Sequence, residues 1–338
     1  MDFLKSKRIA IDLGNNNTLL ADGDRVLLSE PSYIVLDENR KKVRAVGDEA
    51  YEIFEKNHRA LIPVKPLRWG VIADYESAAK MMNALVAKAF RHHRWFNRFD
   101  TIISGVPYST TEVERRALRD ALEQFGARKT QLLFEPISAA LGMGIDIREP
   151  QGKMIVDIGG GITEVVIISL SGIVSFKSIR VGGDNFDCDI QDFFRRQLGM
   201  IVGIKTAEMV KKQIGSVTPS QVPNQEPMIV RGKDIREGIP VSHAVRADQV
   251  AGVLGKSFEA IETCIQQVLE TCPPELAADI YSGGVYVTGG GGLLHGVKDR
   301  LQTYLGIPVH IDKEPLLSVS RGAAMVLRNP KKYQAIAV

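Results

Sequence analysis

The stretch MIVDIGGGITEVVIISLSGIV, residues 154–174, decides the fold. An apolar strand ends at Asp157, three glycines follow at Gly159 to Gly161, and a second apolar strand leaves the turn. Short apolar runs bounded by glycine are typical of buried strands. Glycine also lets backbone N–H groups approach phosphate oxygens, because no Cβ is in the way. The stretch therefore predicts either a phosphate-binding turn or a plain hairpin that needs a positive φ.

The same pattern occurs near the N-terminus, in IAIDLGNNNTLL at residues 9–20. There Asp12 ends a strand, a turn containing Gly14 follows, and a second strand leaves the turn. Asp12 and Asp157 stand 145 residues apart, which is far too long for a solenoid repeat. We therefore expect two related domains that face each other. A carboxylate at each strand end, facing across a cleft, can hold Mg²⁺ through water.

A third glycine cluster lies in YVTGGGGLLHGV, residues 286–297. A short strand runs into four consecutive glycines, and we expect a helix to begin at Leu293. This order of strand, glycines and helix is typical of nucleotide-binding sites. Four glycines exceed what a tight turn needs, so the cluster favours nucleotide binding. By contrast, GVLGKS at 252–257 has the wrong spacing for a P-loop and lies inside a helical pattern.

The composition bounds the class of protein. The chain has 338 residues, 44% hydrophobic and 25% charged, which is ordinary for a globular protein of about two domains. A net charge of +3 is too small to indicate a nucleic-acid partner. The three cysteines form no CxxC pair, which favours reduced thiols in a cytoplasmic protein. No run of about 18 apolar residues predicts a membrane span.

Apolar periodicity predicts helices over 77–99, 111–125, 137–143, 247–271 and 319–327. Thr110 or Thr111 can cap the second of these, because acidic residues follow in its first turn.

Longer segments carry a family resemblance. EPSYIVLD (30–37), TEVERRALRDALEQFGAR (111–128), EPISAALGMGI (135–145), SIRVGGDNFD (178–187) and IVRGKDIREGIP (229–240) resemble the MreB family of bacterial actins, within the actin-like ATPases. The resemblance covers nearly all residues. It implies an α/β actin-like ATPase fold, in which two related ribonuclease-H-like domains surround a nucleotide cleft and each carries a smaller subdomain. The implied boundaries are 1–33, 67–146 and 318–338 for subdomain IA, 34–66 for IB, 147–183 and 250–317 for IIA, and 184–249 for IIB.

The resemblance also implies ATP and Mg²⁺ as cofactors and assigns roles to single residues. Mg²⁺ is held through water at Asp12 and Asp157, and Glu135 orients the attacking water. Thr163 is a second catalytic candidate. The implied nucleotide contacts are Asp12, Gly14, Asn15, Asn16, Asn17 and Thr18 in the first phosphate loop, Gly159, Gly160 and Gly161 in the second, Glu208 and Lys211 at the ribose, and Gly289, Gly290 and Gly291 at the adenosine. Without the family, Glu208 and Lys211 would indicate a solvated salt bridge. The alternative for Glu135 is a surface carboxylate that caps the following helix.

Two departures from the family pattern bear on activity. The first loop reads DLGNNNT where the family has DLGTANT, and the second reads GGGITE where the family has GGGTTE. Asparagine tolerates turn conformations, so we expect the backbone donors to survive. Ile162 cannot hydrogen-bond the attacking water, which predicts intact binding and slowed hydrolysis. Thr163 could substitute only if its hydroxyl faces the cleft, and alternation along a strand turns one of two neighbours away.

Membrane contact is expected at two places. Trp95 and Phe96 stand among arginines, a pattern that suits a headgroup interface. The alternative is a helix end that buries Trp95. Phe3 and Leu4, beside basic residues, could add a small anchor. The resemblance places the protein in the cytoplasm, peripheral on the inner face of an anionic membrane. As partners it implies further copies of the chain, in head-to-tail filaments paired as antiparallel strands, and cell-wall elongation membrane proteins.

The leading hypothesis is an ATPase that polymerises on the membrane and organises cell shape and cell-wall synthesis. A monomeric ATP-binding adaptor of the pilus-assembly type is the main alternative. A small-molecule kinase is a third, although nothing in the sequence resembles a sugar pocket. A paralogous filament that positions an organelle stays open as well.

Overall fold

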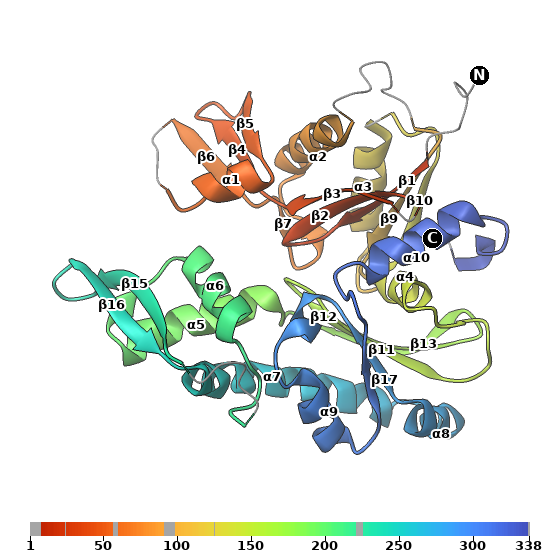
Figure 1. Ribbon diagram of the computed structural model, residues 1–338. Helices are drawn as coiled ribbons and strands as arrows, with labels where there is room; N and C mark the ends of the chain where they lie inside the picture. The colour runs from red at the N-terminus through yellow and green to blue at the C-terminus, as the bar shows by residue number, and fades with distance from the viewer. Residues whose placement is uncertain are drawn as a thin grey trace. The chain divides into compact units, whose positions relative to one another are not determined.

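The computed structural model describes residues 8–23, 25–56, 60–90, 99–124, 126–220 and 226–336 (Figure 1). The chain divides into two compact units. Unit 1 comprises residues 1–150, 169–172 and 316–338, and unit 2 comprises residues 151–168 and 173–315. Each unit is built around a five-stranded sheet of its own.

The sheet of unit 1 has the strand order β10-β9-β1-β2-β3, with β1, β9 and β10 parallel and β1, β2 and β3 antiparallel. The sheet of unit 2 has the order β13-β12-β11-β17-β18, with β11, β17 and β18 parallel and β11 and β12 antiparallel. The strands are β1 (Arg8–Leu13), β2 (Asn17–Asp22), β3 (Arg25–Pro31), β9 (Thr101–Val106), β10 (Thr130–Phe134), β11 (Lys153–Ile158), β12 (Thr163–Ser169), β13 (Gly172–Ile179), β17 (Val285–Thr288) and β18 (Val309–Ile311).

The two sheets have one topology, in which β1, β2, β3, β9 and β10 correspond in order to β11, β12, β13, β17 and β18. The strand register agrees as well. Asp12 lies opposite Leu19 across the first turn, and Asp157 lies opposite Glu164 across the second. The prediction of two related domains is therefore confirmed, and the 145-residue spacing marks a repeat of the whole sheet.

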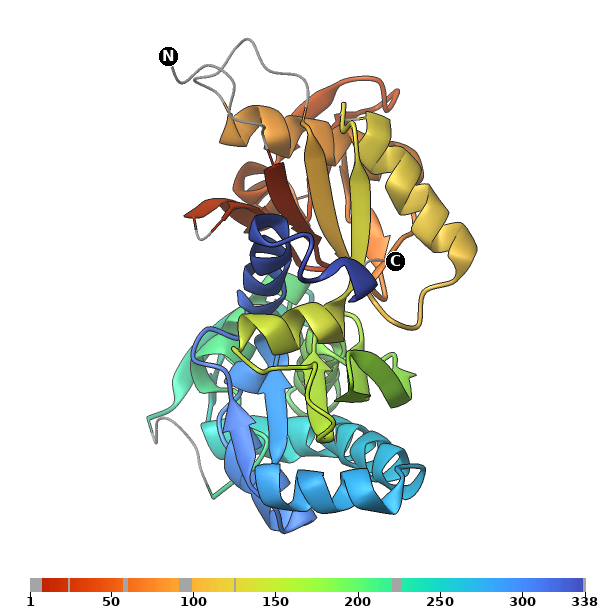
Figure 2. The ribbon, with the colours of Figure 1, turned by 90° about the vertical axis from the view of Figure 1, so that its right-hand side faces the viewer.

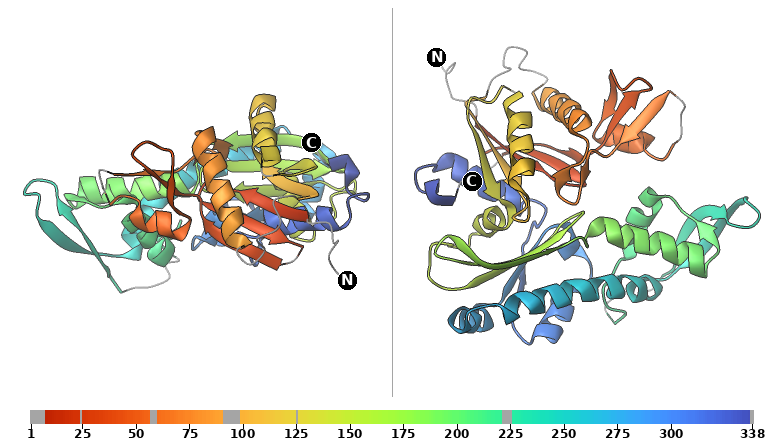
Figure 3. Two further views of the ribbon diagram at one scale, coloured as in Figure 1. Left: turned by 90° about the horizontal axis from the view of Figure 1, so that it is seen from above. Right: turned by 180° about the vertical axis from the view of Figure 1, so that it is seen from behind.

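Helices cover both faces of the unit 1 sheet (Figure 3). α2 (Tyr75–Ala89) and α3 (Glu112–Gln124) pack on one face, where apolar side chains of both helices join those of β1 in one core. α4 (Glu135–Gly142) and α10 (Ser318–Arg328) pack on the other. Successive side chains of β1 point to opposite faces of the sheet, and most of them are apolar and buried. Both faces of β1 are therefore apolar, which suits a strand in the middle of the sheet.

α4 and α10 lie side by side and approach each other at small residues (Figure 2). A Cβ on Gly322 would overlap the carbonyl oxygen of Ser138, and one on Gly142 would overlap that of Ser318. Ser138 Oγ donates to the Val319 carbonyl oxygen over 2.8 Å in this buried contact. The small residues of EPISAALG therefore serve backbone-to-backbone packing of two helices.

In unit 2 the sheet packs on long aromatic-bearing helices. Val156 and Ile158 of β11 share a fully buried core with Phe186 and Phe194 of α5 (Gly183–Gln197) and Phe258 of α7 (Ala247–Glu270). The sequence GVLGKS is confirmed to lie inside α7, as its helical pattern predicts.

Smaller elements complete each unit. The ranges 34–66 and 184–249 hold separate three-stranded sheets, with the orders β5-β4-β6 and β14-β15-β16. The subdomain boundaries at these ranges stay a prediction. The remaining elements are β4 (Ile34–Asp37), β5 (Val43–Val46), α1 (Asp48–Ile53), β6 (Leu61–Val64), β7 (Leu67–Arg68), β8 (Val71–Ile72), β14 (Met200–Ile201), α6 (Ile204–Ile214), β15 (Met228–Asp234), β16 (Pro240–Val245), α8 (Pro274–Gly283), η1 (Gly290–Leu293), α9 (Val297–Leu305) and η2 (Gln334–Ile336).

The predicted start of α3 is confirmed, whereas two other predicted helix boundaries are wrong. Thr111 caps α3 as predicted: its Oγ1 accepts from the Glu114 amide over 3.2 Å, and its own amide donates to the Glu114 carboxylate over 2.8 Å. The helix expected over 77–99 is wrong at its end. α2 stops at Ala89, and Phe99 instead forms a β-bridge with Ala127.

The helix expected from Leu293 is also wrong. The glycines form the short 3₁₀ helix η1, and α9 begins only at Val297. The reason is local, because Gly296 has a φ of 79°, a left-handed conformation that interrupts a right-handed helix.

We predict that Gly322→Ala destabilises the chain by about 3 kcal/mol or more, because the added methyl forces α4 and α10 apart. Gly252→Ala is the matched control, since it lies inside a helix and a Cβ there meets no atom within 4 Å. The control should stabilise by up to about 1 kcal/mol. Urea denaturation of the three chains measures both changes, and equal midpoints for Gly322→Ala and wild type would refute the packing argument.

Candidate nucleotide-binding site

The first loop, in unit 1, is a tight turn closed by one backbone bond. The Gly14 amide donates to the Asn17 carbonyl oxygen over 3.0 Å. A Cβ on Gly14 would lie 2.7 Å from that oxygen, so only glycine fits without a shift. Ser32 supports the turn from behind: its Oγ donates to the Gly14 carbonyl oxygen over 2.7 Å and lies 2.9 Å from Thr18 Oγ1.

The second loop, in unit 2, repeats this geometry. The Gly159 amide donates to the Ile162 carbonyl oxygen over 2.9 Å. The first turn of α5 supports the loop, because the amides of Gly183 and Asp184 donate to the carbonyl oxygens of Gly159 and Gly160 over 3.0 and 2.8 Å. With their carbonyls bound to α5, the glycines have a defined backbone orientation before any ligand arrives.

The third glycine cluster lies against the second loop within unit 2. Gly289 has a φ of 80°, and a Cβ on it would overlap Oδ1 of Asp157. A Cβ on Gly291 would overlap the side chain of Ile158. β11 and β17 are parallel neighbours with Asp157 opposite Thr288, so their carboxyl ends meet at one edge of the sheet. The structure thus brings Asp157 and two of the predicted glycine groups together.

Asp12 and Glu135 share the corresponding edge of unit 1. β1, β9 and β10 run parallel, Asp12 lies near the end of β1, and Glu135 directly follows β10 as the first residue of α4. A Cβ on Gly105 of β9 would lie 3.0 Å from Glu135 Cγ, so glycine there makes room for the glutamate. The carboxyl edge of a sheet with parallel strands is the usual place for a ligand site.

Asp12 and Asp157 are carboxylates near the end of a strand, one in each unit. Burial raises the pKa of Asp12 to about 6, because a charged carboxylate loses hydration inside the protein. Asp157 is 9% exposed. A nearby cation offsets such a cost. The described residues contain no cluster of three or more His, Cys, Asp or Glu side chains that could hold a metal directly. Each aspartate, taken within its own unit, is a carboxylate of the kind that Mg²⁺ accepts through water.

Thr163 and Ile162 are both buried. Thr163 is 0% exposed, and its Oγ1 donates to the Val181 carbonyl oxygen over 2.7 Å. The contact ties β12 to the segment that leads into α5 and occupies the hydroxyl proton of Thr163. Ile162 is 8% exposed and holds the loop through its carbonyl oxygen.

Glu208 and Lys211 each contact a partner of their own in the structure. Glu208 forms an ion pair with Lys212 over 2.8 Å. Lys211 Nζ donates to Asp187 Oδ2 over 2.8 Å and to the Gly183 carbonyl oxygen over 2.9 Å. Asp187 lies four residues, or one helical turn, after the second glycine of SIRVGGDNFD. That spacing is the sequence signal that could have predicted a carboxylate near the second loop as the partner of Lys211. Through α5, this ion pair connects α6 to the second loop.

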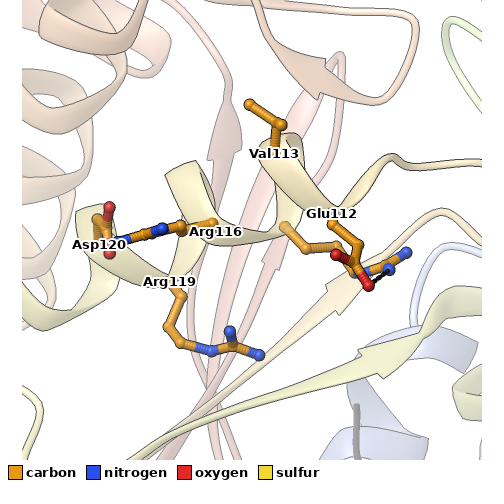
Figure 4. Close-up of a pocket in the computed structure, with 6 residues that line it drawn as sticks. Glu112, Val113, Arg116, Arg119 and Asp120 are labelled. Atoms are coloured by element: carbon orange, nitrogen blue, oxygen red, sulfur yellow. Dashed lines mark ion pairs between the residues drawn. The ribbon is translucent and has the colours of Figure 1, made fainter.

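A groove of about 510 Å³ lies elsewhere on unit 1, along α3 (Figure 4). The residues that line it are Glu112, Val113, Arg115, Arg116, Arg119 and Asp120. Val113 is 78% exposed. None of the six is among the predicted nucleotide contacts, so the groove does not extend the candidate site.

The predicted membrane residues Phe3, Leu4, Trp95 and Phe96 lie outside the described residues. Within the described part of the chain, no helix has the length and apolarity needed to cross a bilayer.

Two equivalent sheets, each with an aspartate before a tight phosphate-type turn, define an actin-like fold. The structure of MreB 5 of Spiroplasma citri bound to AMPPNP superposes with a TM-score of 0.91 at 34% identity, covering 98% of this chain and 99% of that one. The MamK double helical filament superposes with a TM-score of 0.78 at 21% identity, over 96% of this chain and 99% of that one, which supports the fold alone.

The sequence comparisons identify the family within this fold. The profile of the MreB/Mbl protein family matches residues 6–335. Cell shape-determining protein MreB of Escherichia coli (strain K12) is 37% identical over 95% of this chain and 93% of its own length. Cell shape-determining protein Mbl of Bacillus subtilis (strain 168) is 37% identical over 97% of each chain. The chain belongs to the MreB/Mbl family.

Asp187 gives a pH-dependent prediction. Burial raises its pKa from 3.8 to about 7, although Lys211 opposes the shift. The folded state therefore holds this proton more tightly than the unfolded state, so the stability from protonation is present at low pH and lost as the pH rises towards 7. We predict that the free energy of unfolding of wild type falls more steeply between pH 4 and pH 7 than that of Asp187→Asn.

Urea titrations across this pH range measure the slopes. Asp192→Asn, a change at a half-exposed position on the same helix, is the matched control. Parallel curves for wild type and Asp187→Asn would contradict the prediction.

Proposed function

We propose that this chain binds ATP with Mg²⁺, hydrolyses it slowly, and assembles into filaments that organise cell shape and cell-wall synthesis. The observation that carries the proposal is the duplicated loop geometry, in a chain that matches an AMPPNP-bound MreB over 98% of its length. A second solved structure, MreB5 of Spiroplasma citri bound to ADP, matches over 97% of the chain.

The phosphates bind at both loops. The backbone donors at Asn15 to Asn17 and at Gly159 to Gly161 hold the phosphate oxygens, since no side chain larger than glycine fits the closing position of the first turn. Gly289 to Gly291 contact the adenosine. Glu208 lies at the ribose, and Lys211 reaches it by exchanging its bonds to Asp187 and Gly183 for ribose oxygens. These assignments follow the family pattern and the placement of the loops within each unit.

Asp12 and Asp157 hold Mg²⁺ through water, and the cation supplies neutralising charge at the phosphates when bound. Glu135 orients the attacking water from the start of α4. Phosphoryl transfer to water needs an oriented nucleophile and offset charge more than covalent chemistry. Ile162 supplies no hydrogen bond, and the hydroxyl of Thr163 is committed to Val181, so one water-positioning group is missing and hydrolysis is slow.

The filaments form by head-to-tail contact between copies of the chain, a heterologous contact that does not close into a ring. Paired antiparallel strands lie on the inner face of the cell membrane, with Trp95 and Phe96 as the main anchor and Phe3 and Leu4 as a minor one. Membrane proteins of cell-wall elongation are the partners. The relatives that carry the name cell shape-determining protein support this role.

Glu135→Ala should lower the rate of phosphate release about 100-fold or more, because the water loses the group that orients it. AMPPNP affinity should stay within about twofold. Phosphate release and light scattering with ATP and Mg²⁺ measure hydrolysis and assembly in parallel. Glu123→Ala removes an exposed carboxylate from α3 and serves as the control. Hydrolysis at the wild-type rate in Glu135→Ala would show that the catalytic assignment is wrong.

Ile162→Thr should raise the rate of phosphate release by about 5- to 150-fold, the equivalent of one restored hydrogen bond of about 1–3 kcal/mol. Ile162→Val is the matched control, because valine has the shape of threonine without the hydroxyl. The idea fails if threonine and valine give the same rate.

A further inference from the structure

Lys65 lies beside the first loop and is not among the predicted nucleotide contacts. β6 pairs antiparallel with β4, and Val64 lies opposite Ile34. Lys65 directly follows Val64, and Tyr33, which follows the loop-supporting Ser32, directly precedes Ile34. This register brings a cation from the small sheet β5-β4-β6 to the phosphate loop of the large sheet, although 49 residues separate Lys65 from Asn16.

The ammonium group is in contact with the loop itself. Lys65 Nζ donates to Asn16 Oδ1 over 2.5 Å, and the Asn16 carbonyl oxygen accepts from the Ser32 amide over 2.8 Å. Nζ also lies 5.8 Å from the centroid of the Tyr33 ring, within the range of a cation–π contact. Asn16 stands where the family pattern DLGTANT has alanine, whose side chain could not accept this bond.

The position of Lys65 is well supported. Pro66 follows it and restricts its backbone to extended conformations. The carbonyl oxygen of the buried Pro66 accepts from the amides of Ala73 and Asp74 over 2.9 and 3.1 Å. Tyr33 is held in turn by the rings of Tyr51 and Phe54, at centroid distances of 5.3 and 4.7 Å. Pro66, which follows Lys65, and Tyr33, whose ring contacts the ammonium group, are thus both anchored inside unit 1.

The negative charge of a nucleotide favours a cationic side chain beside the loop. The side chains proposed for catalysis and metal binding, Asp12, Glu135 and Asp157, are all acidic, whereas a nucleotide brings several negative charges of its own. A phosphate oxygen is a better acceptor for an ammonium group than the neutral amide oxygen of Asn16, since the two opposite charges attract each other as well. A phosphate at the loop therefore competes with Asn16 for Lys65.

We propose that Lys65 is a phosphate-binding residue of the first loop, and that Asn16 holds its ammonium group beside the loop before the nucleotide arrives. The inference rests on the proposed nucleotide binding and adds a ligand-contacting cation to it. The competing explanation is a purely structural tether, in which Lys65 only joins the small sheet to the loop through Asn16.

Affinity for three probes separates these explanations. AMPPNP and ADP carry phosphates, whereas adenosine does not, and all three are measured with Mg²⁺ by competition against a fluorescent nucleotide. Lys65→Ala should weaken AMPPNP and ADP about tenfold or more, as expected for a lost bond to a charged group, and leave adenosine within about twofold. Lys65→Arg, which keeps the charge, should retain most of the phosphate-dependent affinity.

Matched variants complete the experiment. Lys56→Ala removes an exposed lysine from the same small subdomain and should change no affinity. Asn16→Ala should weaken AMPPNP by less than Lys65→Ala, and the double variant should equal Lys65→Ala alone, because the amide acts only through the ammonium group. If Lys65→Ala fails to fold, Lys65→Gln replaces it.

The outcomes are distinct. An equal loss for all three probes establishes the structural tether and overturns the inference, as does unchanged affinity for AMPPNP and ADP in a folded Lys65→Ala chain. A wild-type chain that binds none of the probes overturns the proposed function, and the inference with it.

Discussion

Both units depend on one backbone constraint, a hydrogen bond that closes a tight turn at the end of a buried strand. In unit 1 it joins the Gly14 amide to the Asn17 carbonyl, and in unit 2 it joins the Gly159 amide to the Ile162 carbonyl. The bond sets where the second strand leaves the turn. It therefore sets the register in which Asp12 lies opposite Leu19 and Asp157 lies opposite Glu164. A slip of one residue would turn every side chain of that strand to the other face.

The support behind each turn differs, although the turns themselves are alike. Unit 1 uses side chains, namely the hydroxyls of Ser32 and Thr18, while unit 2 uses the first amides of α5. In unit 2 the support continues outward through Lys211 to α6, and in unit 1 through Asn16 and Lys65 to the small sheet. Each glycine loop is thus coupled to the smaller subdomain predicted for its own unit. A change at either loop can therefore reach that region through a short chain of polar contacts.

Much of the candidate site could be predicted from the sequence, because its parts are local. A strand, an aspartate and a glycine turn are contiguous, so their geometry follows from a few residues. The partners of single side chains could not be predicted in this way. Glu208 and Lys211 stand three residues apart on one helix face, yet each pairs elsewhere, since Asp187 from α5 offers Lys211 a buried partner. The hydroxyl of Thr163 likewise donates to the carbonyl oxygen of Val181, which is 18 residues away.

The sequence by itself determined the class of fold, the repeated turns, the family and the departure at Ile162, because these depend on residue type, short spacing and the period of apolar residues. Only the tertiary structure decided which polar atoms meet. It brought Gly289 against Asp157, Gly105 beneath Glu135 and Lys65 onto Asn16. These contacts join residues from separate strands and helices, and their distances depend on sheet order and packing, which no local pattern specifies.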